Sequence, residues 1–486
     1  MQHVNPTRRA REARVPTRPV ASFLASSVGS RARLAAAVAA LLAAGCVLTP
    51  EGFDAERAEV DRAGEPYAAE FVQRTLPDLP LDANWRDLVA RALAANGDLE
   101  RAYFDWKSAL ERVAQAAGYP DTNLAPSFSY LLSGSGATAW DNTTVNIAFD
   151  PMRNLSLPSK VRTAGELALA EAHTAGRRFV AAKFALQRKV LGAWLELALL
   201  EEQSRIQIER AELARLGAAS AESRAQLRGD QRDLLRAHLD APAAQLELEG
   251  TLARVRSARA ALNGLLARDP QASLSTQGAL PEPRAVTDDD AALLAAGVVN
   301  DPELEGLAFA VEERERALEL ARLQYLPDFN PFFSFTGSVD QMLGVGVSLP
   351  TRLPQIRAGV AEARALLRGA GAELRQATVD RRAEFVGALT MLRFAERQIA
   401  FLDSEVEPAI LELSAIDSQA YATGGAGFDA LIESQRALLD VRWALAEARI
   451  ERERRVAEIE QIVGVDLATL ERRDVNVAAA EEDRHD

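Results

Sequence analysis

The sequence predicts a mainly α-helical protein with a small β part, in which a unit of long helices and paired strands is duplicated. Three observations predict this fold class. Ala, Leu, Glu and Arg are plentiful while aromatic residues make up only 6% of the chain, a composition typical of long helices. Two stretches of roughly 60 residues have helical character throughout. The same order of helical and alternating segments occurs twice, and an internal repeat constrains the whole fold.

Residues 1–45 have the features of an export signal of the lipoprotein type. They carry seven arginines against one acidic residue, and an apolar run at residues 34–44 precedes Gly45-Cys46. This run is shorter than the roughly 20 residues that a membrane-spanning helix needs. The residues that end at Cys46 resemble a lipobox, so Cys46 is expected to be acylated and held in outer-membrane lipid. The alternative is an ordinary signal peptide with a chance cysteine.

Residues 46–84 are rich in Pro and acidic residues and show little periodicity, which predicts a lipid-anchored linker or wrapping arm. The first repeat is expected to span residues 85–280. Its predicted elements are a helix at 85–118, strands within 127–133 and 145–150, a long helix from 158 to 217 and a closing helix to about 267.

The second repeat is expected to span residues 281–470, followed by a charged, disordered tail at 471–486. The segment from Asn96 to Leu99 matches the segment from Asn300 to Leu304. The predicted elements are an opening helix that ends at Pro327, strands within 333–339 and 343–349, a long helix at 354–421 and a closing helix to about 463.

The predicted strands alternate between apolar side chains and small or polar ones. Phe128, Tyr130 and Leu132 share one face of the first strand, and Leu343 and Val345 do so in the last. Alternation over about ten residues is typical of transmembrane barrel strands. A soluble hairpin with one buried face alternates in the same way, so the strands alone leave both interpretations open.

Lengths favour the membrane interpretation. A helix of about 60 residues is roughly 90 Å long, far more than a compact domain needs. The opening and closing helices together match the long helix, so they can stack end to end beside it and build a cylinder wall. A barrel needs at least about eight strands and one chain supplies four. If these strands cross a membrane, copies must pool them as a dimer, a trimer or a tetramer.

Residues 85–467 resemble the TolC-like outer-membrane efflux protein family. The resemblance rests on Ala92-Leu93 with Asn96 and Asp98-Leu99, on residues 344–367 (GVGVSLPTRLPQIRAGVAEARALL) and on residues 421–449 (YATGGAGFDALIESQRALLDVRWALAEAR). It implies a homotrimer with a twelve-stranded transmembrane β-barrel and a periplasmic α-barrel. It also implies that the helix tips dock onto a periplasmic adaptor protein, which joins an inner-membrane pump.

The resemblance assigns roles to two groups of residues. The glycine-rich helix tips are expected to reverse the chain and to contact the adaptor, although helix termination alone would also explain them. The residues of these expected tips are Gly217, Ser220, Gly424, Gly425 and Gly427. Glu433 aligns with a carboxylate of the constricted tunnel entrance, and Asp429 lies one residue outside the usual register. A solvated helix face is the alternative for both.

The sequence argues against other functions. A net charge of −14 without a basic stripe does not suit nucleic-acid binding. The four His are scattered and Cys46 is the single cysteine, so neither a metal site nor a cofactor is expected. No phosphate-binding loop or nucleophile motif is present, which argues against an enzyme.

The expected function is passive conduction through the outer membrane, driven by the partner pump. One alternative is the outer-membrane duct of a type I protein secretion system. The other is a structural coiled-coil lipoprotein of the periplasm, which would not explain the duplicated hairpins.

Overall fold

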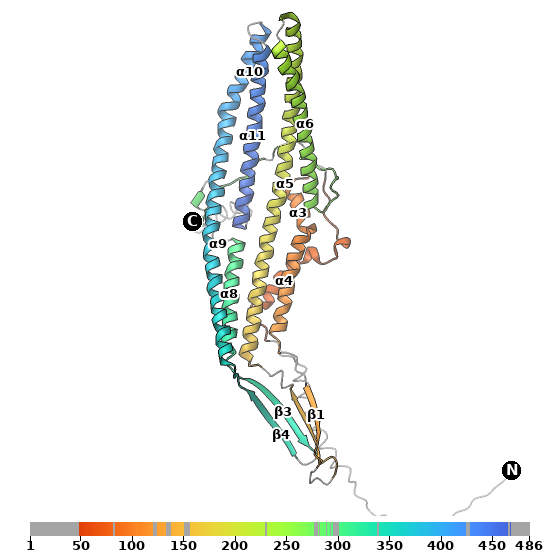
Figure 1. Cartoon of the computed structure of the whole chain (residues 1–486), viewed down its shortest axis with the longest axis vertical. Coiled ribbons are helices and arrows are strands. Elements are labelled where there is room, and N and C mark those ends of the chain that lie inside the picture. The colour runs from red at the N-terminus through yellow and green to blue at the C-terminus, as the bar shows by residue number, and fades with distance from the viewer. Residues whose placement is uncertain are drawn as a thin grey trace, which may run out of the picture.

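The computed structural model of the chain describes residues 48–80, 83–119, 124–132, 138–149, 156–228, 231–276, 280, 282–287, 289–291, 293–294, 301–337, 340–423, 428–464 and 467. The molecule is an elongated rod of helices with a β-sheet at one end (Figure 1).

Long helices run along the whole rod. Helix α5 (Pro158–Arg228) contains 71 residues without interruption, which corresponds to roughly 105 Å at 1.5 Å per residue. The second long path is made of α9 (Leu353–Phe401), a π-helical turn η4 (Leu402–Val406) and α10 (Glu407–Ala422).

Shorter helices stack end to end beside these two paths, as the sequence predicts. The shorter helices are α3 (Trp85–Ala95), α4 (Gly97–Ala116), α6 (Gln231–Leu265), α8 (Pro302–Leu323) and α11 (Phe428–Val463). Helices α3, α4 and α6 lie along one side of α5, while α8 and α11 lie between α5 and the α9–α10 path (Figure 1). Where α3 meets the end of α6, Arg91 Nε donates a hydrogen bond to the Leu266 carbonyl (3.2 Å).

The expected single helix at residues 85–118 is wrong, because the chain breaks at Asn96. The Asn96 side chain accepts hydrogen bonds from the backbone N–H groups of Asp98 (3.0 Å) and Leu99 (3.1 Å), so it caps α4. Asp301 caps α8 in the same way through the N–H groups of Glu303 (2.8 Å) and Leu304 (3.3 Å). The matching segments of the two halves therefore both mark a helix start.

The expected helix break after Gly217 is also wrong. Gly217 and Ser220 lie inside α5, which continues to Arg228 before α6 begins at Gln231. A glycine inside a helix costs only about 1 kcal/mol relative to alanine. Here it allows close packing, because a Cβ at position 217 would lie 3.2 Å from Ile432 Cδ1.

The second long helix, expected to be continuous over 354–421, is interrupted by the π-helical turn η4. Pro408 follows this turn and has no N–H to donate to the carbonyl four residues earlier, which disturbs regular α-helical bonding. The apolar pattern continues through Pro408, so periodicity alone predicts an uninterrupted helix.

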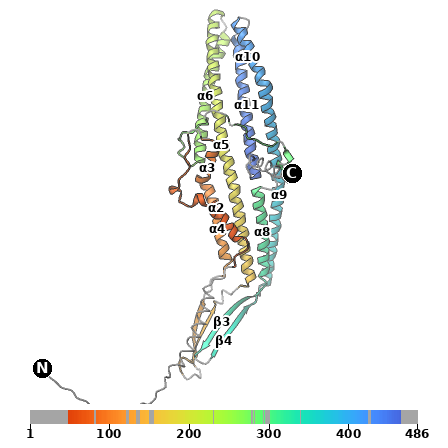
Figure 2. The same ribbon diagram turned by 180° about the vertical axis from the view of Figure 1, so that it is seen from behind.

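The predicted N-terminal arm packs against the rod and contains a helix, α2 (Phe53–Ala63) (Figure 2). Glu56 of α2 is buried and accepts a hydrogen bond from Trp106 Nε1 of α4 (2.7 Å). Two short 3₁₀ turns follow, η2 (Glu65–Tyr67) and η3 (Phe71–Gln73). Beyond them Arg74 forms a two-pronged ion pair with Glu100.

The segment between the two halves is clamped to α11 by a buried arginine. Arg284 donates hydrogen bonds to Glu453 Oε2 (2.8 Å) and Glu460 Oε2 (2.7 Å), and its guanidinium lies over the Trp85 ring. Burial acts to lower the pKa of Arg284, but the charges of Glu460 and Glu453 and the hydrogen bonds to them outweigh it, so the pKa is raised. The clamp fixes the link between the two halves near the middle of the rod.

The two hairpins form one antiparallel sheet in the order β1-β2-β3-β4. The strands are β1 (Leu124–Tyr130), β2 (Thr143–Phe149), β3 (Asp328–Thr336) and β4 (Asp340–Ser348). Each begins earlier than predicted, and β3 runs through Pro331. Pairing with β2 ends at Phe332, so Pro331 lies where β3 is paired on one side only, which accommodates its missing N–H.

Candidate functional site

The sheet has an apolar face that extends across all four strands. Residues paired directly across antiparallel strands lie on the same face of the sheet. Two rows of this face are Phe128, Val145 and Phe335, and Ile147, Phe333 and Leu343. Val345 and Val347 extend the face on β4 toward the helices. The shared apolar face that the sequence predicts is therefore present in one continuous sheet.

This apolar face is exposed apart from Val145, of which only 6% is exposed. Phe128 is 73% exposed, Leu343 80% and Val345 60%. A soluble hairpin would bury such a face against the helices, but the sheet extends away from the end of the rod (Figure 1). An exposed apolar area of this kind marks a surface for contact with a membrane or another protein.

The opposite face of the sheet is small and polar. It presents the row of Ser127, Asn146 and Ser334, and the Thr144 and Thr336 hydroxyls lie 2.9 Å apart in the next row. Phe332 and Met342 are the large apolar exceptions. The Phe332 ring covers Gly344, where an added Cβ would lie only 2.4 Å from the ring.

A buried lysine joins the sheet to the rod. Lys160, in the first turn of α5, donates hydrogen bonds to the Leu326 carbonyl (2.9 Å) and to Asp328 Oδ1 (2.8 Å) at the start of β3. Because the Lys160 side chain is buried, this contact fixes the base of the sheet against the long helix.

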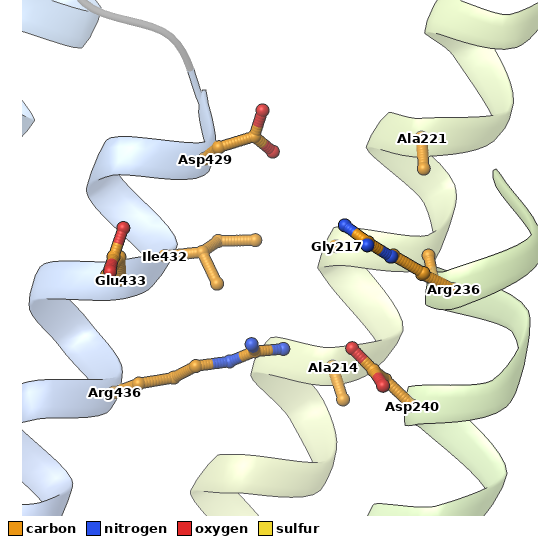
Figure 3. Close-up of a pocket in the computed structure, with 10 residues that line it drawn as sticks. Ala214, Gly217, Ala221, Arg236, Asp240, Asp429, Ile432, Glu433 and Arg436 are labelled. Carbon is orange, nitrogen blue, oxygen red and sulfur yellow. The ribbon is translucent and has the colours of Figure 1, made fainter. Parts of the chain in front are cut away.

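A groove lies at the opposite end of the rod, between the α5/α6 pair and α11 (Figure 3). Its volume is about 510 Å³. Small apolar side chains form its floor: Ala214, Gly217 and Ala221 of α5, Ala237 of α6 and Ile432 of α11. The close contact of Gly217 with Ile432 sets the depth of the floor.

Charged side chains form the two walls of this groove. Arg236 and Asp240 extend from α6, while Asp429, Glu433 and Arg436 extend from α11 (Figure 3). Glu433 and both arginines are exposed. None of these three makes an ion pair within 4.0 Å with any other residue that the structure describes. The groove therefore combines an apolar floor with charges that are available to a partner.

The structure brings the two predicted tunnel-entrance residues together with only one of the predicted tip residues, Gly217. Asp429 and Glu433 lie in the first turns of α11 and line the groove with Gly217, whereas Ser220 lies further along α5. Cys46, Gly424, Gly425 and Gly427 fall outside the described residues. Sequence reasoning missed Arg236, Asp240, Ile432 and Arg436, because their meeting depends on how the two helix pairs align, and no local pattern encodes that alignment.

None of the helices in the described part of the chain combines the length and the apolar composition that spanning a bilayer requires. Within the same part of the chain, no group of three or more His, Cys, Asp or Glu side chains is arranged to hold a metal ion.

Solved structures with the same arrangement of helices and strands are outer-membrane channels. The chain is similar to the outer-membrane channel OprN (TM-score 0.62, 18% identity, covering 79% of this chain and 90% of that one). It is similar to VceC of Vibrio cholerae (TM-score 0.62, 19% identity, covering 79% of this chain and 97% of that one). It is also similar to the CmeC channel of Campylobacter jejuni (TM-score 0.62, 15% identity, covering 83% of this chain and 92% of that one).

The sequence itself matches no protein-family model and no curated protein. The fold is thus that of the TolC-like outer-membrane channels, and the predicted class, mainly α-helical with a small β part, is confirmed for the single chain.

Proposed function

We propose that the chain is the outer-membrane channel subunit of a tripartite efflux system and conducts substrates passively out of the cell. The exposed apolar face of the sheet, at the end of a rod about 105 Å long, carries this proposal. A membrane would cover the sheet while the rod extends into the periplasm. The fold shared with OprN, VceC and CmeC supports it.

The sheet supports assembly of copies. Strands β1 and β4 are its two edges, and unpaired strand edges are not stable in lipid. Pooling with other copies removes the edges, and three copies give twelve strands, which is the homotrimer that the resemblance implies. Exposed aromatic residues, Tyr130 and Trp140, lie toward the end of the sheet away from the rod, where a membrane–water interface favours them.

The rod supports the same assembly. On α6, Leu235 is 65% exposed and Leu246 is 70% exposed, and Leu413 and Ile416 of α10 are exposed too. These helices lie on opposite sides of the described rod, so α6 of one copy can cover α10 of the next. Three copies would thereby close a helical cylinder in line with the sheet.

Conductance tests the channel itself. Purified full-length protein in a planar lipid bilayer is expected to give steady single-channel steps, because the closed sheet would enclose a water-filled lumen. A structural periplasmic lipoprotein would give no steps, so their absence in correctly folded protein would refute the channel proposal and favour that alternative.

The groove at the tip is the proposed docking surface for the periplasmic adaptor protein that joins the inner-membrane pump. Its apolar floor suits the side chains of a partner helix, and the exposed charges of Arg236, Glu433 and Arg436 can pair with that helix. Asp429 and Glu433 are proposed to lie beside the tunnel entrance, where carboxylates would favour cations. Gly217 contributes to docking by keeping the floor low, rather than by reversing the chain.

Filling the groove tests this docking. Gly217→Leu is expected to weaken adaptor binding at least tenfold, because the new side chain would occupy the floor beside Ile432. Gly192→Leu is a matched control in the same helix, since a Cβ there meets nothing within 4 Å. Binding of the adaptor encoded with this protein can be measured by surface plasmon resonance, and equal affinity for both variants would contradict the proposal.

Cys46 is the proposed acylation site that holds the arm in outer-membrane lipid. Cys46→Ser is expected to abolish acylation, so intact-mass spectrometry should show the loss of the lipid. Loss of the lipid anchor should also release the protein more readily from membranes during assembly. A lipid-shifted mass that persists in the variant would show that the anchor lies elsewhere.

The remaining alternative is a duct for a type I protein secretion system. The two functions differ in what leaves the cell, and a deletion strain separates them. Accumulation of a small fluorescent dye is expected for an efflux channel. Loss of a secreted protein from the medium, with dye export unchanged, would favour the secretion alternative.

A further inference from the structure

The four strands carry only two charged residues, Asp328 and Asp340, one at each end of the sheet. Both lie on the polar face. Asp340 pairs with Thr336, which pairs with Thr144, and Asp328 lies on the same side of β3 as Thr336. Outside the strands, the hairpin turns add no basic residue, because residues 124–149 and 328–348 contain neither Lys nor Arg.

The two aspartates differ in their environment. Asp328, near the rod, is neutralised by the Lys160 ammonium at 2.8 Å. Asp340 is exposed at the far end and makes no ion pair with the described residues. Its negative charge is therefore not compensated by any ion pair in the part of the chain that the structure describes.

A second carboxylate lies at the same end. The Asp141 backbone packs against the β3–β4 turn, where a Cβ on Gly337 would lie 2.5 Å from Asp141 Cα. Asp141 accepts hydrogen bonds from the Thr138 N–H (3.0 Å) and hydroxyl (2.7 Å), which hold it in place.

We infer that Asp340 gives the outer mouth of the channel a preference for cations. The inference rests on the proposed function, in which the apolar face contacts lipid and the polar face lines the lumen. Three copies then place three Asp340 carboxylates around the exit, with Asp141 nearby and no basic residue in the strands or turns to oppose them. A ring of acidic side chains in a pore favours cations over anions.

The substrate class follows from this ring. Cationic and neutral solutes meet no electrostatic barrier at the exit, whereas solutes with several negative charges are repelled from it. Because the remaining lumen face of the strands is mainly hydroxyl, amide and glycine, charge discrimination at this end depends on Asp340.

The experiment compares ion selectivity of wild type and Asp340→Asn in planar bilayers under a potassium chloride gradient. The K⁺/Cl⁻ permeability ratio is expected to fall about twofold in the variant at ~0.1 M salt, and further at ~0.01 M, where the charges are less screened. Asp340→Glu should retain the wild-type ratio. Asp105→Asn, which removes the same charge from the exposed surface of α4, should leave the ratio unchanged.

An unchanged ratio in a conducting Asp340→Asn channel would overturn this inference and leave the proposed function intact. An equal fall in Asp105→Asn would also overturn it, since the effect would then reflect net charge. Absence of conductance in the wild type would refute the proposed function, and this inference with it.

Discussion

Replacing Leu343 with arginine is expected to abolish insertion of the sheet into the outer membrane, whereas the same replacement at Met342 is expected to be tolerated. The two residues are neighbours on β4, are unbranched or singly branched apolar side chains, and are both exposed, at 80% and 56%. They differ in the face they occupy. Leu343 pairs with Phe333 on the apolar face, and Met342 pairs with Ser334 on the polar face.

The difference follows from the proposed lipid contact. An arginine that faces lipid near the middle of the bilayer costs about 2–4 kcal/mol per copy, while lumen-facing substitutions are far less costly. In a trimer this cost is met three times during assembly. Leu343→Arg should therefore leave little folded oligomer, and Met342→Arg should keep most of it.

The measurement is the amount of folded oligomer in the outer-membrane fraction, detected by its heat-dependent migration on SDS gels, with bilayer conductance as a second readout. Equal amounts of folded oligomer for the two variants would show that the apolar face does not contact lipid. A greater loss for Met342→Arg would place the opposite face in the membrane.

The second large effect is expected at the buried clamp in the middle of the rod. Arg284→Met should destabilise the protein by about 3–5 kcal/mol, because the buried Glu453 and Glu460 both lose their ion pair with Arg284, and of the two only Glu453 still pairs with Arg452. The side chains of Glu453 and Glu460 are 4% and 3% exposed, so water cannot replace the lost interaction. The segment that links the two halves should then detach from α11.

Thermal unfolding by far-UV circular dichroism measures this effect, and limited proteolysis of the linking segment reports its detachment. Arg205→Met is the matched control, because Arg205 is 61% exposed and its pair with Glu202 is worth less than about 1 kcal/mol. Adding Glu453→Gln and Glu460→Gln to Arg284→Met should restore much of the stability. Similar unfolding temperatures for the two single variants would show that the clamp is not a major source of stability.

The order of elements could be predicted from the sequence because each type of element has its own local pattern. Helical periodicity over residues 158–217 and strict alternation around Phe128 and Leu343 are properties of consecutive residues. The duplication then fixed the order of helices and strands in the second half, and the matching of Asn96 with Asp301 as helix caps agrees with it.

Helix ends were harder to predict. Gly217 predicts a break when its helix is considered alone, but its packing against Ile432 offsets the cost of a glycine inside α5. The apolar pattern continues on both sides of Asn96. One continuous helix and two consecutive helices would therefore show the same periodicity. The capping hydrogen bonds alone distinguish them.

The sequence by itself determined the class of fold, the alternating strands and the presence of very long helices, because these depend on interactions between near neighbours in the chain. Only the tertiary structure decided that all four strands share one sheet with an exposed apolar face. It also decided that Arg236 and Arg436 line one groove and that Lys160 neutralises Asp328 but leaves Asp340 charged. These features depend on strand register and helix alignment, which are set by packing between residues that are distant in the sequence.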